Sequence, residues 1–370
     1  MASISEASGS LSQQKTIAPQ SAAQRPGWLA RLLQRWGVRA ARVAPPGAQT
    51  AEGPLAAPDK VAFVLLGGGA RGAAQAGALA VALEQGIRPD VIIGVSAGAW
   101  NGAYLAVDPT PERARQLCEI WAGLKNTDLL GGGWWRAAIS AVSGRPALYG
   151  AEGPIRVARR YMDRQTFEEL KTPLWIMATN LTSGQPKLFS SGRVVQAILA
   201  SSAVPGIFPP VVLDGQVYVD GGLLEWDACA EALRLGARTV YLFACGAIGE
   251  LSPRLMPQEA LEQHNGKAPN GRRTIAPLFR PPEDTLGASM LDVLERSWDV
   301  VSQYQLRRAV EGLRSGGARV IPIEPSLPLH SRALDFSQSH AAIAAGRASA
   351  EAVLQVAPSL AAVGAVAGIA

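Results

Sequence analysis

The segment KVAFVLLGGGARG, residues 60–72, joins a run of apolar residues to a cluster of glycines. The apolar run over 61–66 is typical of a strand that is buried on both faces of a parallel sheet. A second segment, DVIIGVSAG at residues 90–98, predicts another strand that ends in a serine between glycines. Helices are predicted over 70–85 and 97–106, directly after the two strands. This alternation predicts a three-layer α/β/α fold with a mostly parallel central sheet.

The alternation of strands and helices continues through the rest of the chain. Further strands are predicted over 174–179, 211–213, 216–219, 239–244 and 319–323. Further helices are predicted over 114–124, 154–161, 194–200, 228–235 and 289–314. We therefore expect one large domain over 59–325, which includes a mobile loop at 246–288, and a C-terminal helical tail at 326–370.

Residues 1–58 are rich in Ala, Ser, Gln and Pro and are predicted to be mostly disordered. The exception is Trp28–Val43, where apolar residues share one helical face and four arginines share another. Such a basic amphipathic helix can lie on an anionic membrane surface. The alternative, a helix that packs on its own domain or stays frayed, remains open.

The charge of the chain is unevenly distributed. The formal net charge is +5, and residues 1–50 alone account for it, with six basic residues and one acidic residue. The remaining 320 residues carry 29 basic and 29 acidic groups, so we expect no nucleic-acid partner. Three cysteines without a CxxC pair and three scattered histidines predict no metal site and no cofactor. No secretory signal is visible, so we expect a cytoplasmic protein, peripheral at the inner face of the membrane if the N-terminal helix binds there.

The glycine cluster after the first strand is a candidate anion-binding loop. Glycines there leave backbone N–H groups free to point at an incoming anion. The G-x-G-x-x-G spacing also fits a dinucleotide-binding loop, which would require an acidic residue at the end of the second strand. That strand ends instead in Gly94-Val95-Ser96-Ala97-Gly98, which disfavours the dinucleotide interpretation.

Gly94–Gly98 forms a G-x-S-x-G sequence between a predicted strand and a predicted helix, the context of a nucleophile elbow. The serine needs a base to act as a nucleophile at neutral pH. Asp220 is the favoured candidate, because it leaves the second strand of a predicted hairpin and is followed by Gly221 and Gly222. Asp214 and Gly215 are predicted to form the turn of that hairpin.

Together these motifs resemble the patatin-like phospholipase family, and are closest to its small bacterial members. That family has a G-G-G-x-R-G loop, a G-x-S-x-G elbow on the next strand and a later D-G-G motif. The resemblance covers roughly residues 60–246. It implies an oxyanion loop formed by Gly67, Gly68, Gly69, Ala70, Arg71 and Gly72.

The resemblance implies a serine acyl-ester hydrolase that acts on lipids, of the phospholipase A type. Ser96 would attack the ester, Asp220 would accept its proton, and the backbone N–H groups around Gly68, Gly69 and Ala70 would stabilise the oxyanion. Arg71 would hold the loop in place or meet an anionic head group. After the aspartate, the Asn-x-Pro stretch of many members is replaced by Glu225-Trp226-Asp227-Ala228, so substrate preference does not carry over.

Two alternatives from other classes remain open. One is an esterase with a Ser-His-acid triad, in which His330 or His340 would serve as the base. The other is a membrane-associated protein that kept the patatin fold and lost its activity.

Overall fold

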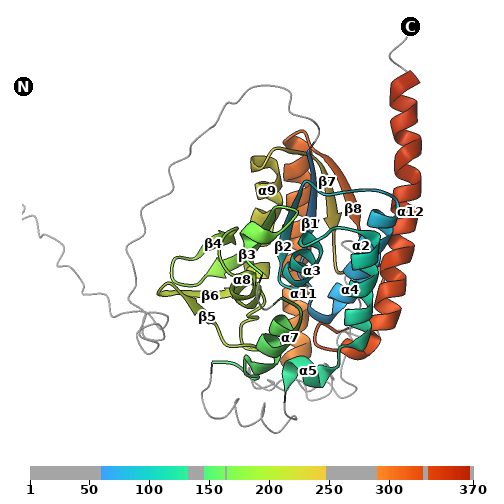
Figure 1. The fold of residues 1–370 in the computed structure, drawn as a ribbon. Helices are drawn as coiled ribbons and strands as arrows, with labels where there is room; N and C mark the ends of the chain where they lie inside the picture. Colours follow the sequence, from blue (N-terminus) through green and yellow to red (C-terminus); the bar gives the residue numbers. More distant parts are fainter. Residues whose placement is uncertain (1–59, 132–145, 163–164, 247–289, 328–331, 367–370) are drawn as a thin grey trace, which may run out of the picture. The chain divides into compact units, whose positions relative to one another are not determined.

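The computed structural model describes residues 60–131, 146–162, 165–246, 290–327 and 332–366 (Figure 1). Every described residue belongs to one compact unit within Ala41–Ala370. The N-terminal segment 1–58 with the helix predicted over 28–43, the part of the predicted loop 246–288 that follows Gly246, and His330 lie outside the described residues. The proposed domain boundaries therefore stay predictions.

The described part contains an eight-stranded sheet of order β5-β6-β3-β2-β1-β7-β8, with β4 paired to β3. The neighbouring strands β3, β2, β1, β7 and β8 are parallel to one another, whereas β4 and β6 run antiparallel to β3. The strands are β1 (Lys60–Leu65), β2 (Val91–Val95), β3 (Leu174–Asn180), β4 (Gln185–Phe189), β5 (Val211–Leu213), β6 (Gln216–Asp220), β7 (Ala237–Phe243) and β8 (Arg319–Ile323).

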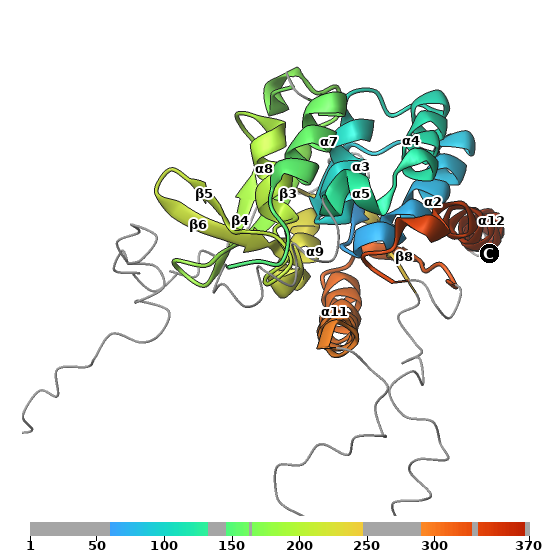
Figure 2. The same ribbon diagram turned by 90° about the horizontal axis from the view of Figure 1, so that it is seen from below.

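Helices cover both faces of the sheet. They are α2 (Gly72–Glu84), α3 (Ala97–Ala106), α4 (Pro111–Gly123), α5 (Asn126–Leu130), α7 (Glu152–Met162), α8 (Val194–Ser201), α9 (Trp226–Arg234), α11 (Met290–Ser315) and α12 (Ser339–Val366). Figure 2 shows α11 and α9 on one side of the sheet, with α2, α3 and α4 on the other. The mostly parallel three-layer fold predicted from the sequence is thus confirmed.

The core forms two clusters, because successive side chains of a strand point to opposite faces. On β1, Phe63 and Leu65 pack with α2, α3, α4 and α12, whereas Ala62 and Val64 pack with α9 and α11. This explains why β1 is apolar without alternation.

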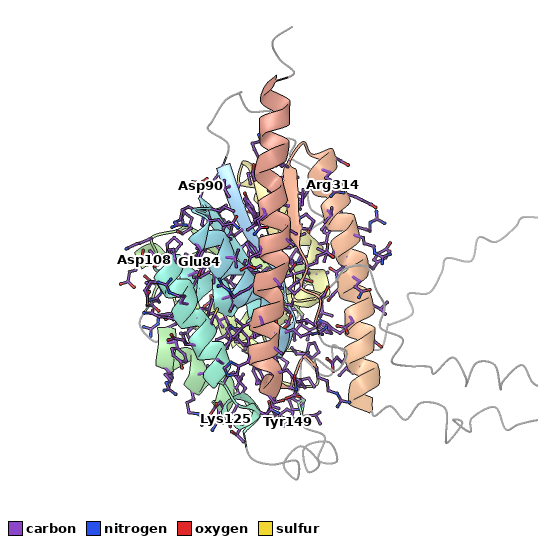
Figure 3. The ribbon with its side chains drawn as sticks, turned by 90° about the vertical axis from the view of Figure 1, so that its right-hand side faces the viewer. Glu84, Asp90, Asp108, Lys125, Tyr149 and Arg314 are labelled. Atoms are coloured by element: carbon purple, nitrogen blue, oxygen red, sulfur yellow. The ribbon has the colours of Figure 1, made fainter. Side chains whose placement is uncertain are left out.

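Helix α2 is buried from Gly72 to Leu83, since it lies between the sheet and α12. The two helices approach closely at two glycines. A Cβ on Gly77 would lie 2.2 Å from the Ile343 carbonyl oxygen, and one on Gly346 would lie 1.8 Å from that of Ala74. Glu84 at the exposed end of α2 lies beside α12 and pairs with Arg347 (Figure 3).

One local prediction needs correction, and two elements were missed. Helix α4 begins at Pro111, not at residue 114, because the Thr110 side chain caps it and proline suits the first helical position. Strand β4 and the short helix α5 were not predicted. The β4 sequence QPKLF contains a proline and two exposed polar residues and has no fully buried residue, which is typical of an edge strand and gives no buried-strand signal.

The predicted hairpin is confirmed. Strands β5 and β6 pair from Val211↔Tyr218 to Leu213↔Gln216, and Asp214 and Gly215 form the two-residue turn with φ of 49° and 71°. Positive φ at both positions is the requirement of this turn type and explains the Asp-Gly sequence.

Candidate active site

Ser96 lies on the sharp turn between β2 and α3. Its φ of 52° is in the left-handed region, which is unusual for a residue other than glycine. The glycines on either side allow the turn: a Cβ on Gly98 would lie 2.1 Å from the Leu65 carbonyl oxygen, and one on Gly94 would lie 2.6 Å from the Gly98 carbonyl oxygen. Strain of this kind is concentrated at functional sites.

Asp220 reaches Ser96 because of the register along β3. Residues Ile92–Val95 of β2 pair with the first half of β3, ending at Val95↔Met177. β6 pairs with the second half, starting at Ala178↔Asp220. Since β4 occupies the other edge of β3 over 176–180, β2 and β6 lie on the same edge and end facing each other.

The two side chains form a direct hydrogen bond. The Ser96 hydroxyl donates to Asp220 Oδ2 at 2.6 Å, and both residues are buried. The two residues are 124 positions apart in the sequence and meet where two strands end.

Besides the bond from Ser96, two further hydrogen bonds hold Asp220 in place. Its Oδ1 accepts a hydrogen bond from the Gly222 N–H at 2.7 Å, and its carbonyl oxygen accepts one from the Thr179 hydroxyl at 3.0 Å. A Cβ on Gly221 would lie 2.3 Å from the Met177 carbonyl oxygen, so the glycine allows the chain to turn against β3. Burial raises the pKa of Asp220 to about 6, although the hydrogen bonds from Ser96 and Gly222 act in the opposite direction.

Two hydrogen bonds through Ser201, a residue that the sequence analysis did not identify, also hold the turn at Ser96 in place. The Ser96 N–H donates to the Ser201 hydroxyl at 2.9 Å, and that hydroxyl donates to the Met177 carbonyl oxygen at 2.5 Å. Ser201 ends α8 and is fully buried. The one indication in the sequence was a serine at the end of a mostly apolar helix, VVQAILAS.

Two of the four amides from Gly67 to Ala70 already have acceptors. The Gly67 N–H donates to Glu225 Oε1, and the Ala70 N–H donates to the Ala333 carbonyl oxygen at 2.7 Å. Ala70 was expected among the oxyanion donors, and its amide is engaged instead. Within the described part of the chain, the Gly68 and Gly69 N–H groups have no acceptor, so these two are available to an incoming oxyanion.

The loop itself excludes side chains. A Cβ on Gly68 would lie 2.2 Å from Cys245 Cβ, and one on Gly69, whose φ is 59°, would lie 2.2 Å from the Ala333 carbonyl oxygen. One on Gly72 would lie 2.8 Å from Ala97 Cβ at the start of α3. The glycines therefore allow the loop to lie tightly between the end of the sheet, α3 and the segment before α12.

Arg71 anchors the loop to α11. Its guanidinium group contacts Asp299 at 2.7 Å and Glu295 at 3.8 Å. Below the loop, Gln75 donates to the carbonyl oxygens of Leu66 and Phe243, and Asn101 donates to Gln75. Of the two roles considered for Arg71, these ion pairs support holding the loop.

Glu225 follows the Asp-Gly-Gly motif and is 4% exposed. Burial raises the pKa of Glu225 to about 8, with a further contribution from the negative charge of Asp220, while the hydrogen bond from Gly67 acts in the opposite direction. It is therefore a neutral carboxyl group at pH 7, next to the start of the glycine loop.

Ser96 lies between two cavities. The first, the apolar pocket, is formed by α3, α4, α5 and α7, and none of its described lining residues is charged. Its walls include Trp100, Leu117, Trp121, Leu129, Val157 and Phe208. The second, the charged pocket, contains Arg71, Asp220, Glu225 and Glu295, together with Trp298. Ala333 and Leu334 line both pockets.

Other candidate groups lie elsewhere. His340 is exposed on α12 and lines neither pocket. Over the described ranges, no group of three His, Cys, Asp or Glu side chains is arranged to hold a metal ion. All three cysteines are free thiols. No helix among the described residues is both long and apolar enough to cross a bilayer.

Residues 63–227 match the family model described as Patatin-like phospholipase. Lysophospholipase nte1 of Aspergillus terreus is 31% identical over 195 residues, which is 52% of this chain and 12% of that protein. Patatin-like phospholipase domain-containing protein 7 of Mus musculus is 28% identical over 194 residues, 51% of this chain and 14% of that protein. The match thus spans a small part of these curated relatives.

Among solved structures, VipD from Legionella pneumophila aligns with 81% of this chain and 67% of that chain. The sequence identity is 16% and the TM-score is 0.42.

Proposed function

We propose that the chain hydrolyses acyl esters of lipids through Ser96 and Asp220, because residues 63–227 match the patatin-like phospholipase family model. The observation that carries this proposal is the 2.6 Å hydrogen bond from the Ser96 hydroxyl to Asp220 Oδ2, formed on a strained turn beside two unoccupied amides. No other residue is needed as the base.

Acylation follows from this geometry. Ser96 Oγ attacks the ester carbonyl carbon while its proton passes to Asp220. The Gly68 and Gly69 N–H groups stabilise the oxyanion of the tetrahedral intermediate, each worth roughly 10²- to 10³-fold in rate. When the intermediate collapses, the bond to the alcohol oxygen breaks and that oxygen takes the proton from Asp220.

Deacylation uses the same groups in the reverse order. Water attacks the acyl-serine carbonyl carbon and gives a proton to Asp220. The bond to Ser96 Oγ then breaks, the proton returns to this oxygen, and the carboxylic acid leaves. Atoms and charges balance over the cycle without a histidine.

The apolar pocket supports a lipid substrate. Its aromatic and aliphatic walls can bury a hydrocarbon chain, and each buried methylene contributes about 0.8 kcal/mol. Because Ser96 lies in the wall of the pocket, a chain placed there would present its carbonyl group to the hydroxyl. Relatives named lysophospholipase and patatin-like phospholipase support a phospholipid or lysophospholipid as the substrate class.

The test compares two aspartates on the same hairpin. We expect Ser96→Ala and Asp220→Asn to lower kcat/KM for a long-chain p-nitrophenyl ester by about 10³-fold or more. Asp214→Asn, at the exposed turn, should retain wild-type hydrolysis and is the matched control. A fluorophosphonate probe should label the wild type and not Ser96→Ala.

Three results would contradict the proposal. Labelling that persists in Ser96→Ala would place the nucleophile elsewhere. Loss of activity in His330→Ala or His340→Ala with activity retained in Asp220→Asn would favour the triad. No labelling and no ester hydrolysis by the wild type would favour an inactive patatin-fold protein.

A further inference from the structure

Glu225 is a buried carboxyl group that the proposed mechanism does not use. It follows the short turn Gly221–Leu224 and precedes the first residue of α9. Its Oε1 accepts the Gly67 N–H, and no second hydrogen bond to this carboxyl group is formed among the described residues. One carboxyl oxygen is thus left for a molecule in the pocket.

The carboxyl group lies close to the reacting atoms. A Cβ placed on Gly67 would lie 3.2 Å from Ser96 Cβ and 3.4 Å from Glu225 Oε1, so both groups border the same small space. Glu225 also shares the wall of the charged pocket with Ser96 and Asp220. Because the apolar pocket on the other side of Ser96 suits the acyl chain, the charged pocket remains for the departing alcohol.

The surroundings of Glu225 favour its protonated form. Among the described residues that line the pockets beside Glu225, the one cation is Arg71, whose guanidinium already contacts Asp299 and Glu295. The other ionisable groups that interact with Glu225 within the described ranges are an acid and two thiols: Asp220 at the end of β6, Cys229 on α9 and Cys245 after β7. A protonated carboxyl group has an O–H that can donate a hydrogen bond, which a carboxylate lacks.

We propose that protonated Glu225 donates a hydrogen bond to the ester oxygen that departs when Ser96 is acylated. This inference rests on the proposed function. The proton that the departing oxygen takes still comes from Asp220, and Glu225 keeps its own, so the reaction balances as before. Glu225 thereby makes the site suited to alkyl esters, whose alkoxide is a poor leaving group.

The experiment compares two esters of the same fatty acid, one of p-nitrophenol and one of glycerol. The nitrophenolate leaves readily without a hydrogen bond, whereas the glycerol oxygen does not. Glu225→Ala should lower kcat/KM for the glycerol ester about 10- to 100-fold more than for the p-nitrophenyl ester. Glu225→Gln should recover most of this difference, because its amide can accept from Gly67 and still donate.

A matched control lies on α9, the helix that follows Glu225. Glu231 pairs with Arg234 and lines neither pocket, so Glu231→Ala should not change the ratio of the two rates. The wild type should also lose glycerol-ester hydrolysis as the pH rises through about 8, where Glu225 ionises, and Glu225→Gln should not.

Equal losses on both esters in Glu225→Ala would overturn the inference and leave Glu225 as a support of the glycine loop. If Glu225→Ala does not fold, the pH profile of Glu225→Gln tests the inference instead. A loss of glycerol-ester hydrolysis through about pH 8 that is the same in Glu225→Gln as in the wild type would overturn it. Failure of the proposed function gives a different result, since the wild type would then hydrolyse neither ester.

Discussion

The two pockets that meet at Ser96 differ in what they can hold. The apolar pocket is walled by side chains from α3, α4, α5 and α7, without a charged group among its described residues. The charged pocket contains a guanidinium group and three carboxyl groups, two of which are buried and have raised pKa values. Ser96, the proposed nucleophile, therefore lies on the boundary between a region suited to hydrocarbon and a region suited to proton transfer.

This difference separates two properties of the proposed enzyme. The size of the apolar pocket should set which acyl chains are accepted, and the ionisation of the charged pocket should set the pH at which they are hydrolysed. Changes in one pocket should leave the property of the other unaltered. Three predictions test this separation.

The largest effect is expected from filling the apolar pocket. Leu129 on α5 is half-buried and lines this pocket, so Leu129→Trp should displace part of a long acyl chain. Excluding two or three methylenes costs roughly 2 kcal/mol, which lowers kcat/KM for a long-chain ester by about 10- to 50-fold. Hydrolysis of the acetyl ester should change much less. The measurement is the ratio of rates on the two esters.

Val212→Trp is the control, because Val212 is exposed on β5 and lines neither pocket. The substitution adds the same indole without filling the site. If both variants change the chain-length ratio alike, or neither does, the apolar pocket does not hold the acyl chain.

The sequence predicted that Ser96 and Asp220 each lie at the end of a strand, but it did not predict the contact between them. Ser96 and Asp220 could both be assigned to strand ends, because the strands before them are apolar and glycines follow. Their contact depends on the register of β3 and on β4, which fills the opposite edge of β3 and leaves β6 on the edge of β2. Strand β4 carries no apolar pattern, so this arrangement could not be predicted.

The partners of the glycine loop were equally hidden. The loop was recognisable from its glycines, yet its Gly67 and Ala70 amides are engaged by Glu225 and Ala333, which lie 158 and more than 250 residues further along the chain. No local pattern marks a residue as the acceptor for so distant an amide. The catalytic roles themselves remain predictions.

The second prediction concerns pH. Asp220 must be ionised to accept the Ser96 proton, and burial raises its pKa to about 6. Activity should therefore rise with pH through about 6, and at pH 5 it should be roughly tenfold below its plateau. A pH profile of kcat/KM on a soluble ester measures this limb.

The separation of the two pockets sharpens this result. The acid limb should fall at the same pH for short and long acyl chains, because the described residues of the apolar pocket include no carboxyl group and no histidine. It should also be unchanged in Leu129→Trp. A limb near pH 4, the ordinary range of an exposed aspartate, would show that Asp220 is not the base in its buried form.

The smallest effect is expected at the two ends of α2, each of which is tied by an ion pair to another helix. Arg71, at the end beside the charged pocket, pairs with Asp299 on α11, and Glu84, at the far end, pairs with Arg347 on α12. Asp299→Ala should loosen the glycine loop, lower kcat about 3- to 10-fold on short and long esters alike, and lower the free energy of unfolding by about 1–3 kcal/mol. Glu84→Ala should lower that free energy by less than about 1 kcal/mol and leave kcat unchanged, because the pair is partly exposed and touches neither pocket. The measurements are kcat, from steady-state kinetics, and the free energy of unfolding, from chemical denaturation, for both variants. If Asp299→Ala and Glu84→Ala lower kcat equally, then α2 as a whole, and not the ion pair of Arg71, sets the geometry of the glycine loop.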